Sequence, residues 1–142
     1  MTFKRKHVMA VVVTALSAFG LSLLWYSHLL VGDIWLRLSN ADPSGMPLWK
    51  TLIAPFRELA AAGVLAYLIV RLGIIRVKSA AAFGLGMWFA FHAVQMAGAV
   101  IWDNMPWRLG AIHAGDWLIK MVFMAVVLTV WLRQETLRYA RH

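Results

Sequence analysis

Hydrophobic residues in this chain fall into four long segments that are separated by short polar stretches. An α-helix rises about 1.5 Å per residue, so roughly 20 apolar residues cross a hydrocarbon core of about 30 Å. The strands of a membrane β-barrel would instead alternate apolar with polar residues, a pattern that these segments lack. The sequence therefore predicts four transmembrane helices, at about 8–31, 51–72, 79–102 and 113–132.

The connections predict how these helices are arranged. Those at 73–78 and 103–112 are too short to hold a domain, so successive helices must run in opposite directions. The longer connection before the second helix contains an amphipathic stretch, Ile34–Leu38, which predicts a short interfacial helix, and then the turn formers of Asn40–Gly45. We expect an all-α fold with a single transmembrane domain over residues 1–142, an integral membrane four-helix antiparallel bundle (up-down-up-down).

Composition supports a membrane protein, and the charges predict its orientation. The chain is 62% hydrophobic, whereas a soluble domain is about half apolar, and 14 Lys and Arg against 6 Asp and Glu give a net charge of +8. Nine of the fourteen basic residues fall at one end of the predicted bundle: Lys4, Arg5, Lys6, Arg71, Arg76, Lys78, Arg133, Arg138 and Arg141. The positive-inside rule places that end and both termini in the cytoplasm, N-in and C-in. The basic charge then indicates contact with the lipid bilayer and with anionic lipids at the cytoplasmic rim, and no nucleic acid partner is expected.

The N-terminus also has features of a secretory signal peptide. A basic segment at 4–6 precedes an apolar segment at 8–14, and small residues at 15–17 could form a cleavage site. Hydrophobicity nevertheless continues without a break to Val31, which is long enough to cross the bilayer. We therefore expect the first span to be retained.

Charged residues inside the predicted spans are the strongest functional candidates. A charge near the bilayer centre costs about 2.5 to 3.5 kcal/mol on insertion scales, so such side chains should face the bundle interior and pair. Depth along the helices matches Glu58 with Lys120, and Arg57 with Asp116.

Helical periodicity predicts which of the polar and aromatic residues share a face of each span. The shared faces are Ser17, Leu21, Trp25 and His28 on the first span; Trp88, His92, Gln95, Ala99 and Trp102 on the third; and His113, Asp116 and Lys120 on the fourth. Most tryptophans also fall toward the outer interface. If these faces converge with Glu58, they form a polar, Trp-lined cavity in the outer half of the bundle. The predicted ligand-binding residues are Glu58, Asp116, Lys120, His92, Gln95, His28, Arg57, Trp25 and Trp117.

Catalytic and metal chemistry find less support. The absence of cysteine excludes disulfides, thiolate metal sites and a cysteine nucleophile. Ser27 and His28 are adjacent and so point about 100° apart on a helix, which does not suit a nucleophile and its base. His28, His113, Asp116 and Glu58 carry ligand atoms for a metal, but their spacing matches no strong motif. We expect no catalytic residue and no cofactor.

Three classes of function stay open. The first is binding or passage of a small amphipathic or cationic ligand in the outer cavity, as a ligand-binding protein or transporter. The second is a structural or accessory membrane subunit whose polar residues serve helix association. A metal-dependent membrane enzyme is the third. Small residues spaced by four on the third span, Ala82 with Gly86 and Ala93 with Ala97, also allow a homodimer.

The chain resembles a known family in two segments. Trp25-Tyr26-Ser27-His28-Leu29-Leu30-Val31-Gly32-Asp33-Ile34-Trp35 resembles the Trp-Tyr-Ser-Pro-x-x-Phe-Gly-x-x-Trp signature of small bacterial membrane proteins grouped as domain of unknown function 1761. The stretch from Pro106 to Trp131 is similar to that family's last hairpin. His28 replaces the usual proline, and Asp116 stands between Gly115 and the aromatic residue. The resemblance implies a four-span fold in the bacterial inner (cytoplasmic) membrane, and it brings no assigned activity or site.

Overall fold

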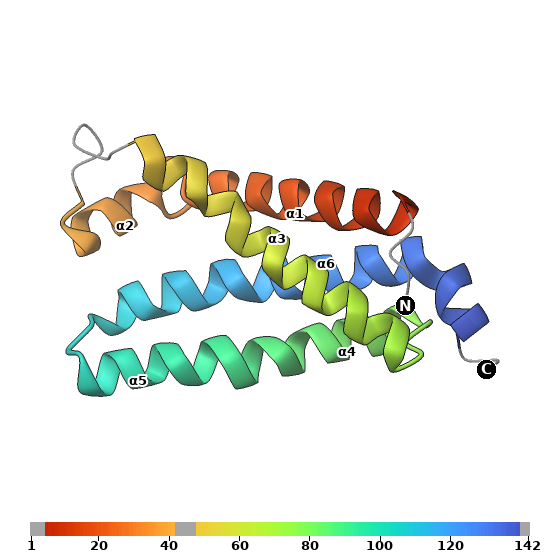
Figure 1. Cartoon of the computed structure of the whole chain (residues 1–142). Helices are drawn as coiled ribbons and strands as arrows, with labels where there is room; N and C mark the ends of the chain where they lie inside the picture. Colours follow the sequence, from red (N-terminus) through yellow and green to blue (C-terminus); the bar gives the residue numbers. More distant parts are fainter. Residues whose placement is uncertain (1–4, 42–47, 140–142) are drawn as a thin grey trace.

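The computed structural model describes residues 5–41 and 48–139, and every regular element within them is a helix (Figure 1). The elements are α1 (Arg5–Trp25), α2 (Gly32–Ser39), α3 (Leu48–Arg71), α4 (Val77–Trp88), the π-helix η2 (Phe89–Ala93), α5 (Val94–Trp102) and α6 (Trp107–Tyr139). Four helices are long and apolar enough to cross a membrane, because α4, η2 and α5 form one continuous helix. The expected all-α fold with four apolar helices is confirmed.

The first helix ends earlier than its hydrophobicity predicts. α1 stops at Trp25, six residues before the expected Val31, and a turn leads into α2. The Ser27 hydroxyl donates to the Leu24 carbonyl and accepts from the Leu29 amide, so it competes with continued helical bonding. Gly32 then packs so closely on the preceding turn that a Cβ there would lie 2.4 Å from the Tyr26 carbonyl oxygen.

A short helix at the predicted position is confirmed as α2, and it extends beyond the predicted Ile34–Leu38 to two turns, while its place at a membrane interface stays a prediction. It ends at Asn40, whose backbone is left-handed (φ 50°), a conformation that asparagine adopts more readily than most residues. The remainder of the predicted turn, 42–45, lies outside the described residues.

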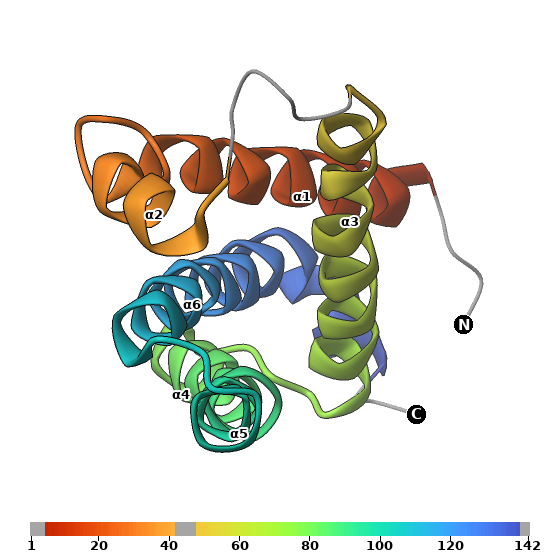
Figure 2. The same cartoon turned by 90° about the vertical axis from the view of Figure 1, so that its left-hand side faces the viewer.

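α6 is the central helix of the bundle. It contacts α1, α3, α4 and α5, and Figure 2 shows it between α1 on one side and the α4–α5 helix on the other, with α3 crossing beside them. The start of α1, the end of α6 and the connection from α3 to α4 lie at one end of the molecule, while α2 and the turn from α5 to α6 lie at the opposite end (Figure 1). We refer to these as the terminal end and the α2 end.

Small residues bring α1 against its neighbours. Ala10, Thr14, Ala18 and Ser22 are spaced by four and are all buried, whereas the predicted face of α1 is wrong because Ser17 is exposed. The true buried face is displaced by one residue, which is about 100° around the helix. Hydrophobic positions alone did not fix this rotation, since nearly every residue of α1 is apolar.

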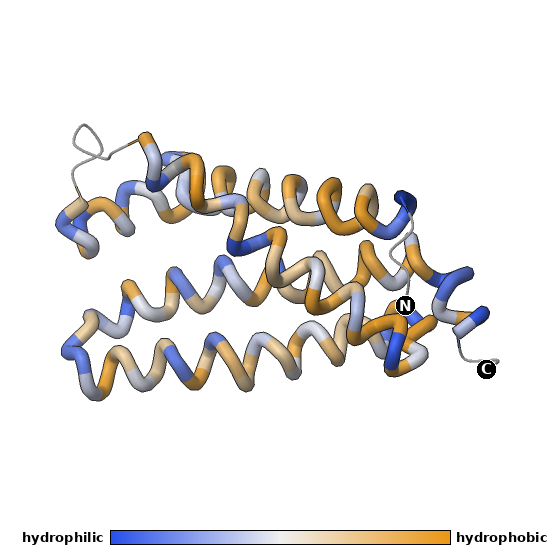
Figure 3. The backbone as a smooth tube through the Cα atoms, in the orientation of Figure 1, coloured by the Kyte–Doolittle hydropathy of each residue, from blue (hydrophilic) through white to orange (hydrophobic). Residues whose placement is uncertain are grey.

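The terminal half of the bundle has an apolar core, while the α2 half contains charge. Side chains of α1, α3 and α6 form the core, including Leu65, Ile69, Met124 and Leu128. The hydropathy-coloured tube in Figure 3 shows hydrophilic positions partway along α3 and in the α2-end half of α6. These positions belong to the candidate site.

Candidate functional site

A buried ionic cluster joins α3 to α6. Lys120 Nζ lies 2.7 Å from Glu58 Oε1 and 2.8 Å from Asp116 Oδ2, and the side chains of Lys120 and Glu58 are fully buried. The predicted pairing of Glu58 with Lys120 is therefore confirmed. Asp116 and Lys120 are one turn apart on α6, so a single ammonium group reaches both carboxylates.

A third helix joins the cluster through Ser22 of α1. Its hydroxyl donates to Asp116 Oδ1 at 2.6 Å, so both oxygens of that carboxylate are occupied. Glu58 differs, because its Oε2 is buried and accepts no hydrogen bond within the part of the chain that the structure describes. Two carboxylates against one ammonium leave the cluster with one net negative charge, and its spare acceptor is Glu58 Oε2.

The Trp117 ring lies between groups from three helices. His92 of η2 stacks on it with ring centroids 4.4 Å apart and planes at 22°. Lys120 Nζ lies 3.9 Å from the ring centroid, and the Arg57 guanidinium of α3 lies 5.9 Å from it. Cations are attracted to the indole π-face, so this ring helps to hold both basic groups.

A cavity of about 430 Å³ opens beside the cluster, between α1, α2, α3 and α6. It is lined by Phe19, Ser22, Leu23, Tyr26, Trp35, Lys50, Ala54, Arg57, Glu58, His113, Asp116 and Trp117. These residues come from the α2-end portions of their helices, away from both termini. Its walls are mainly apolar and aromatic, with the two carboxylates among them, and its volume is in the range of small-molecule sites.

Tyr26, Trp35 and His113 form one wall of the cavity. The Tyr26 hydroxyl lies 2.9 Å from His113 Nδ1, and the Tyr26 ring packs edge-on against Trp35 with centroids 5.4 Å apart. Tyr26 follows the end of α1, where burial and then the Asp116 carboxylate raise the pKa of its hydroxyl. The phenol therefore keeps its hydrogen, which leaves it able to donate to His113 Nδ1.

Two indoles fix the segment of α6 that carries the cluster. Trp25 of α1 donates its Nε1 hydrogen to the Ile112 carbonyl, at a donor–acceptor distance of 3.1 Å. Trp88 of α4 donates its Nε1 hydrogen to the Ala114 carbonyl, at 2.7 Å. Trp25 packs directly against Gly115, where a Cβ would lie 2.9 Å from its ring. The predicted site residue Trp25 thus orients α6 and does not line the cavity.

Arg57 does not form the ion pair that depth alone predicts. Asp116 pairs with Lys120 from the same helix, and Arg57 is exposed at the cavity wall. Equal depth was insufficient because Arg57 and Glu58 are consecutive, so their side chains point about 100° apart. Only one of them faces the bundle interior, and Glu58 takes that position.

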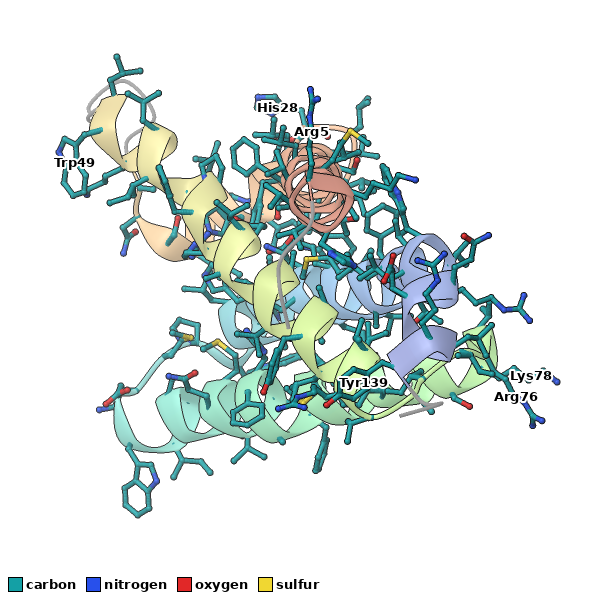
Figure 4. The ribbon with its side chains drawn as sticks, turned by 45° about the vertical axis from the view of Figure 1, so that its right-hand side comes forward. Arg5, His28, Trp49, Arg76, Lys78 and Tyr139 are labelled. Carbon is teal, nitrogen blue, oxygen red and sulfur yellow. The ribbon has the colours of Figure 1, made fainter. Side chains whose placement is uncertain are left out.

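Four other predicted ligand-binding residues lie outside the cavity lining, and one of them, Lys120, is buried in the ionic cluster. His28 is exposed and bonds to Asp33 in the turn beyond α1, because the helix that would have aligned it with Trp25 has already ended; Figure 4 shows it at the surface. His92 lies behind Trp117, and Gln95 is exposed on α5. His92 and Gln95 lie on different faces because the π-helix changes the direction in which every residue after it points.

Several cavity residues were not predicted. Tyr26 lies in the turn after α1 and Trp35 lies in α2, and neither was on a helical face that the sequence analysis assigned to the cavity. Ser22 belongs to the small-residue stripe of α1, and that four-residue spacing is the sequence signal that would have found it. His113 was predicted to lie on the cavity-facing side of the fourth span and to be a weak metal ligand, but it was not among the predicted ligand-binding residues. Within residues 5–41 and 48–139, no three His, Asp or Glu side chains gather as a metal site, and His28 lies apart from Glu58 and Asp116.

Comparison with known proteins gives one match. A search of curated proteins and a search of solved structures find no significant match. A family model described as "Protein of unknown function (DUF1761)" matches residues 9–129, which include the ionic cluster and the whole cavity lining. Because the match covers most of the chain, the protein belongs to the DUF1761 family.

Proposed function

We propose that this chain is an integral protein of the bacterial inner membrane with four antiparallel spans and both termini in the cytoplasm. The four long apolar helices support the four spans. The start of α1, the end of α6 and the α3 to α4 connection lie at one end of the molecule (Figure 1), and that end carries Arg71, Arg76, Lys78 and Arg138 among its basic residues. The cavity then opens in the outer half of the bilayer.

We further propose that the cavity binds a small amphipathic ligand with a cationic group. The observation that carries this function is Glu58, which is fully buried, lines the cavity and keeps one carboxylate oxygen without a hydrogen-bond partner among the described residues. Burying a carboxylate is costly unless both oxygens are satisfied, and a ligand ammonium group would supply the missing donor.

The remaining walls fit the rest of such a ligand. Phe19, Leu23, Tyr26 and Trp35 offer apolar and aromatic surface. Aromatic faces also attract cations in a water-poor environment. The ionic cluster has one net negative charge before the ligand arrives, so a monocation neutralises it.

Isothermal titration calorimetry of the full chain in an uncharged maltoside detergent tests this function. The probes are n-octylammonium and n-octanol, which have the same chain length and differ in charge. We expect octylammonium to bind more tightly than octanol, and Glu58→Gln to weaken octylammonium binding about tenfold through loss of a charge-assisted bond. Asp103→Asn is the matched control, because it removes an exposed carboxylate away from the cavity. Equal binding of the two probes, or an unchanged affinity in Glu58→Gln, would overturn the proposal.

A structural role is the second candidate, favoured by the fact that the cluster joins three helices. Lys120 links α6 to α3, and Asp116 links α6 to α1 through Ser22. If helix association is the whole function, Glu58→Gln lowers the unfolding temperature strongly and octylammonium leaves that of the wild type unchanged. Under the binding function, octylammonium raises it, because a ligand that binds only the folded state stabilises that state.

A further inference from the structure

We propose that the ligand is zwitterionic, and that its anionic group binds Arg57 and Lys50 while its ammonium group binds Glu58. This inference rests on the proposed ligand-binding function and adds the second half of the ligand. Arg57 and Lys50 line the same cavity as Glu58, and all three come from α3.

Neither of these two basic side chains has an acidic partner among the residues that the structure describes. Within the described parts of the chain, Arg57 contacts the Trp117 ring at 5.9 Å and Lys50 contacts the Trp49 ring at 5.8 Å, and neither forms an ion pair. Lys120 differs sharply, since two carboxylates hold it. The cavity therefore has two cations that no described carboxylate neutralises and that can accept an anion.

The positions of these groups separate the two charges of a ligand. Lys50 and Arg57 are seven residues apart, which places them two turns apart on one face of α3, and both are exposed. Glu58 follows Arg57 and is fully buried. The two basic side chains of the cavity lining are thus exposed, while Glu58 is a buried member of the same lining.

Charge balance favours a zwitterion over a simple cation. A ligand with only an ammonium group would neutralise Glu58 but would lie near Arg57 and Lys50, which repel it. An added phosphate or carboxylate removes that repulsion and supplies acceptors for the guanidinium, which suits such anions well. A primary ammonium and an anionic group joined by a short linker match all three side chains.

Two sources could provide this chemistry: the phosphoethanolamine headgroup of a membrane lipid, or a free zwitterion such as phosphoethanolamine itself. The probes are dihexanoyl phosphatidylethanolamine, free phosphoethanolamine and n-octylammonium, titrated into the full chain in maltoside detergent. We expect the lipid to bind the wild type about tenfold more tightly than octylammonium, because it gains a charge-assisted contact. Free phosphoethanolamine binding as tightly as the lipid would also support the inference, with a soluble ligand as the source.

Arg57→Gln isolates the anion site. We expect it to weaken binding of the zwitterionic lipid about tenfold while octylammonium binds at least as well as before. Arg108→Gln is the matched control, because Arg108 is also an exposed arginine over a tryptophan, at 5.6 Å from Trp107, yet lies outside the cavity lining.

The outcomes separate this inference from the proposed function. If octylammonium binds and depends on Glu58, but the zwitterions bind no more tightly and Arg57→Gln has no effect, the inference is overturned and the proposed function stands. If none of the probes binds the wild type, both are overturned.

Discussion

Lys120 Nζ lies 2.7 Å from Glu58 Oε1, and neither side chain is exposed. Such a pair joins two helices at a high desolvation cost, which the attraction between the charges offsets only while both are present. Asp116 adds a second carboxylate 2.8 Å from the same ammonium group. Lys120 is therefore the group on which the stability of the buried cluster depends most.

Replacing Lys120 with methionine should strongly destabilise the fold. The change keeps an unbranched side chain but leaves Glu58 and Asp116 as two buried carboxylates without a cation, and breaking a buried pair in this way costs about 3 to 5 kcal/mol. The free energy of unfolding, measured by titration with dodecyl sulfate, checks this loss.

Two further variants show whether the loss comes from charge. Adding Glu58→Gln to Lys120→Met should recover part of the lost stability, because one of the uncompensated charges is then removed. Arg138→Met breaks an exposed pair with Glu135 and should change the free energy of unfolding by less than about 1 kcal/mol. Additive effects of Glu58→Gln and Lys120→Met would contradict the coupling.

Ser22→Ala should weaken the attachment of α1 to α6. It removes the 2.6 Å hydrogen bond to Asp116 Oδ1, and a bond to a charged group contributes about 1.5 to 3 kcal/mol. Ser17→Ala, at an exposed position of the same helix, is the control and should be nearly neutral. Equal changes in the two variants would show that the hydrogen bond to Asp116 does not stabilise the attachment of α1 to α6.

The positions of the helices along the chain could be predicted from sequence more completely than the rotation of each helix about its own axis. Long apolar runs fix where helices occur, because bilayer thickness and helical rise set the required length. The pairing of Glu58 with Lys120 also followed, since buried charges must find partners at equal depth. The rotation of α1 did not follow, because a helix that is apolar on all sides carries little information about which side is buried.

Local backbone features caused the other errors. The helix ends at Trp25 through side-chain bonding by Ser27, which hydropathy does not register, so His28 was misplaced. The π-helix at Phe89–Ala93 breaks the helical period between His92 and Gln95. Neither feature has a strong sequence signature, and each moves the residues beyond it to another face.

Cysteine labelling should locate the two ends of the bundle relative to the membrane. The chain has no cysteine, so single replacements at exposed positions report unambiguously. Asp103→Cys, in the turn at the α2 end, should react with a membrane-impermeant maleimide in intact spheroplasts. Lys78→Cys lies near the start of α4, where Figure 4 shows Lys78 and Arg76 pointing outward, and should react only after permeabilisation. The reverse labelling pattern would contradict the proposed topology and show that the α2 end faces the cytoplasm.

Gly84→Ala should loosen the packing of α4 on α6. A Cβ at Gly84 would lie 2.7 Å from the Met121 carbonyl oxygen and 3.0 Å from the Val122 Cα, and backbone atoms cannot move aside without shifting a helix. Overpacking of this kind costs about 1 to 3 kcal/mol. Gly86→Ala is the matched control on the same helix, because a Cβ there meets nothing within 4 Å, and the better helix propensity of alanine should stabilise it by about 0.5 to 1 kcal/mol. Unfolding in dodecyl sulfate should thus move in opposite directions for the two variants. A gain in stability at Gly84 would show that α4 does not lie against α6 as closely as described.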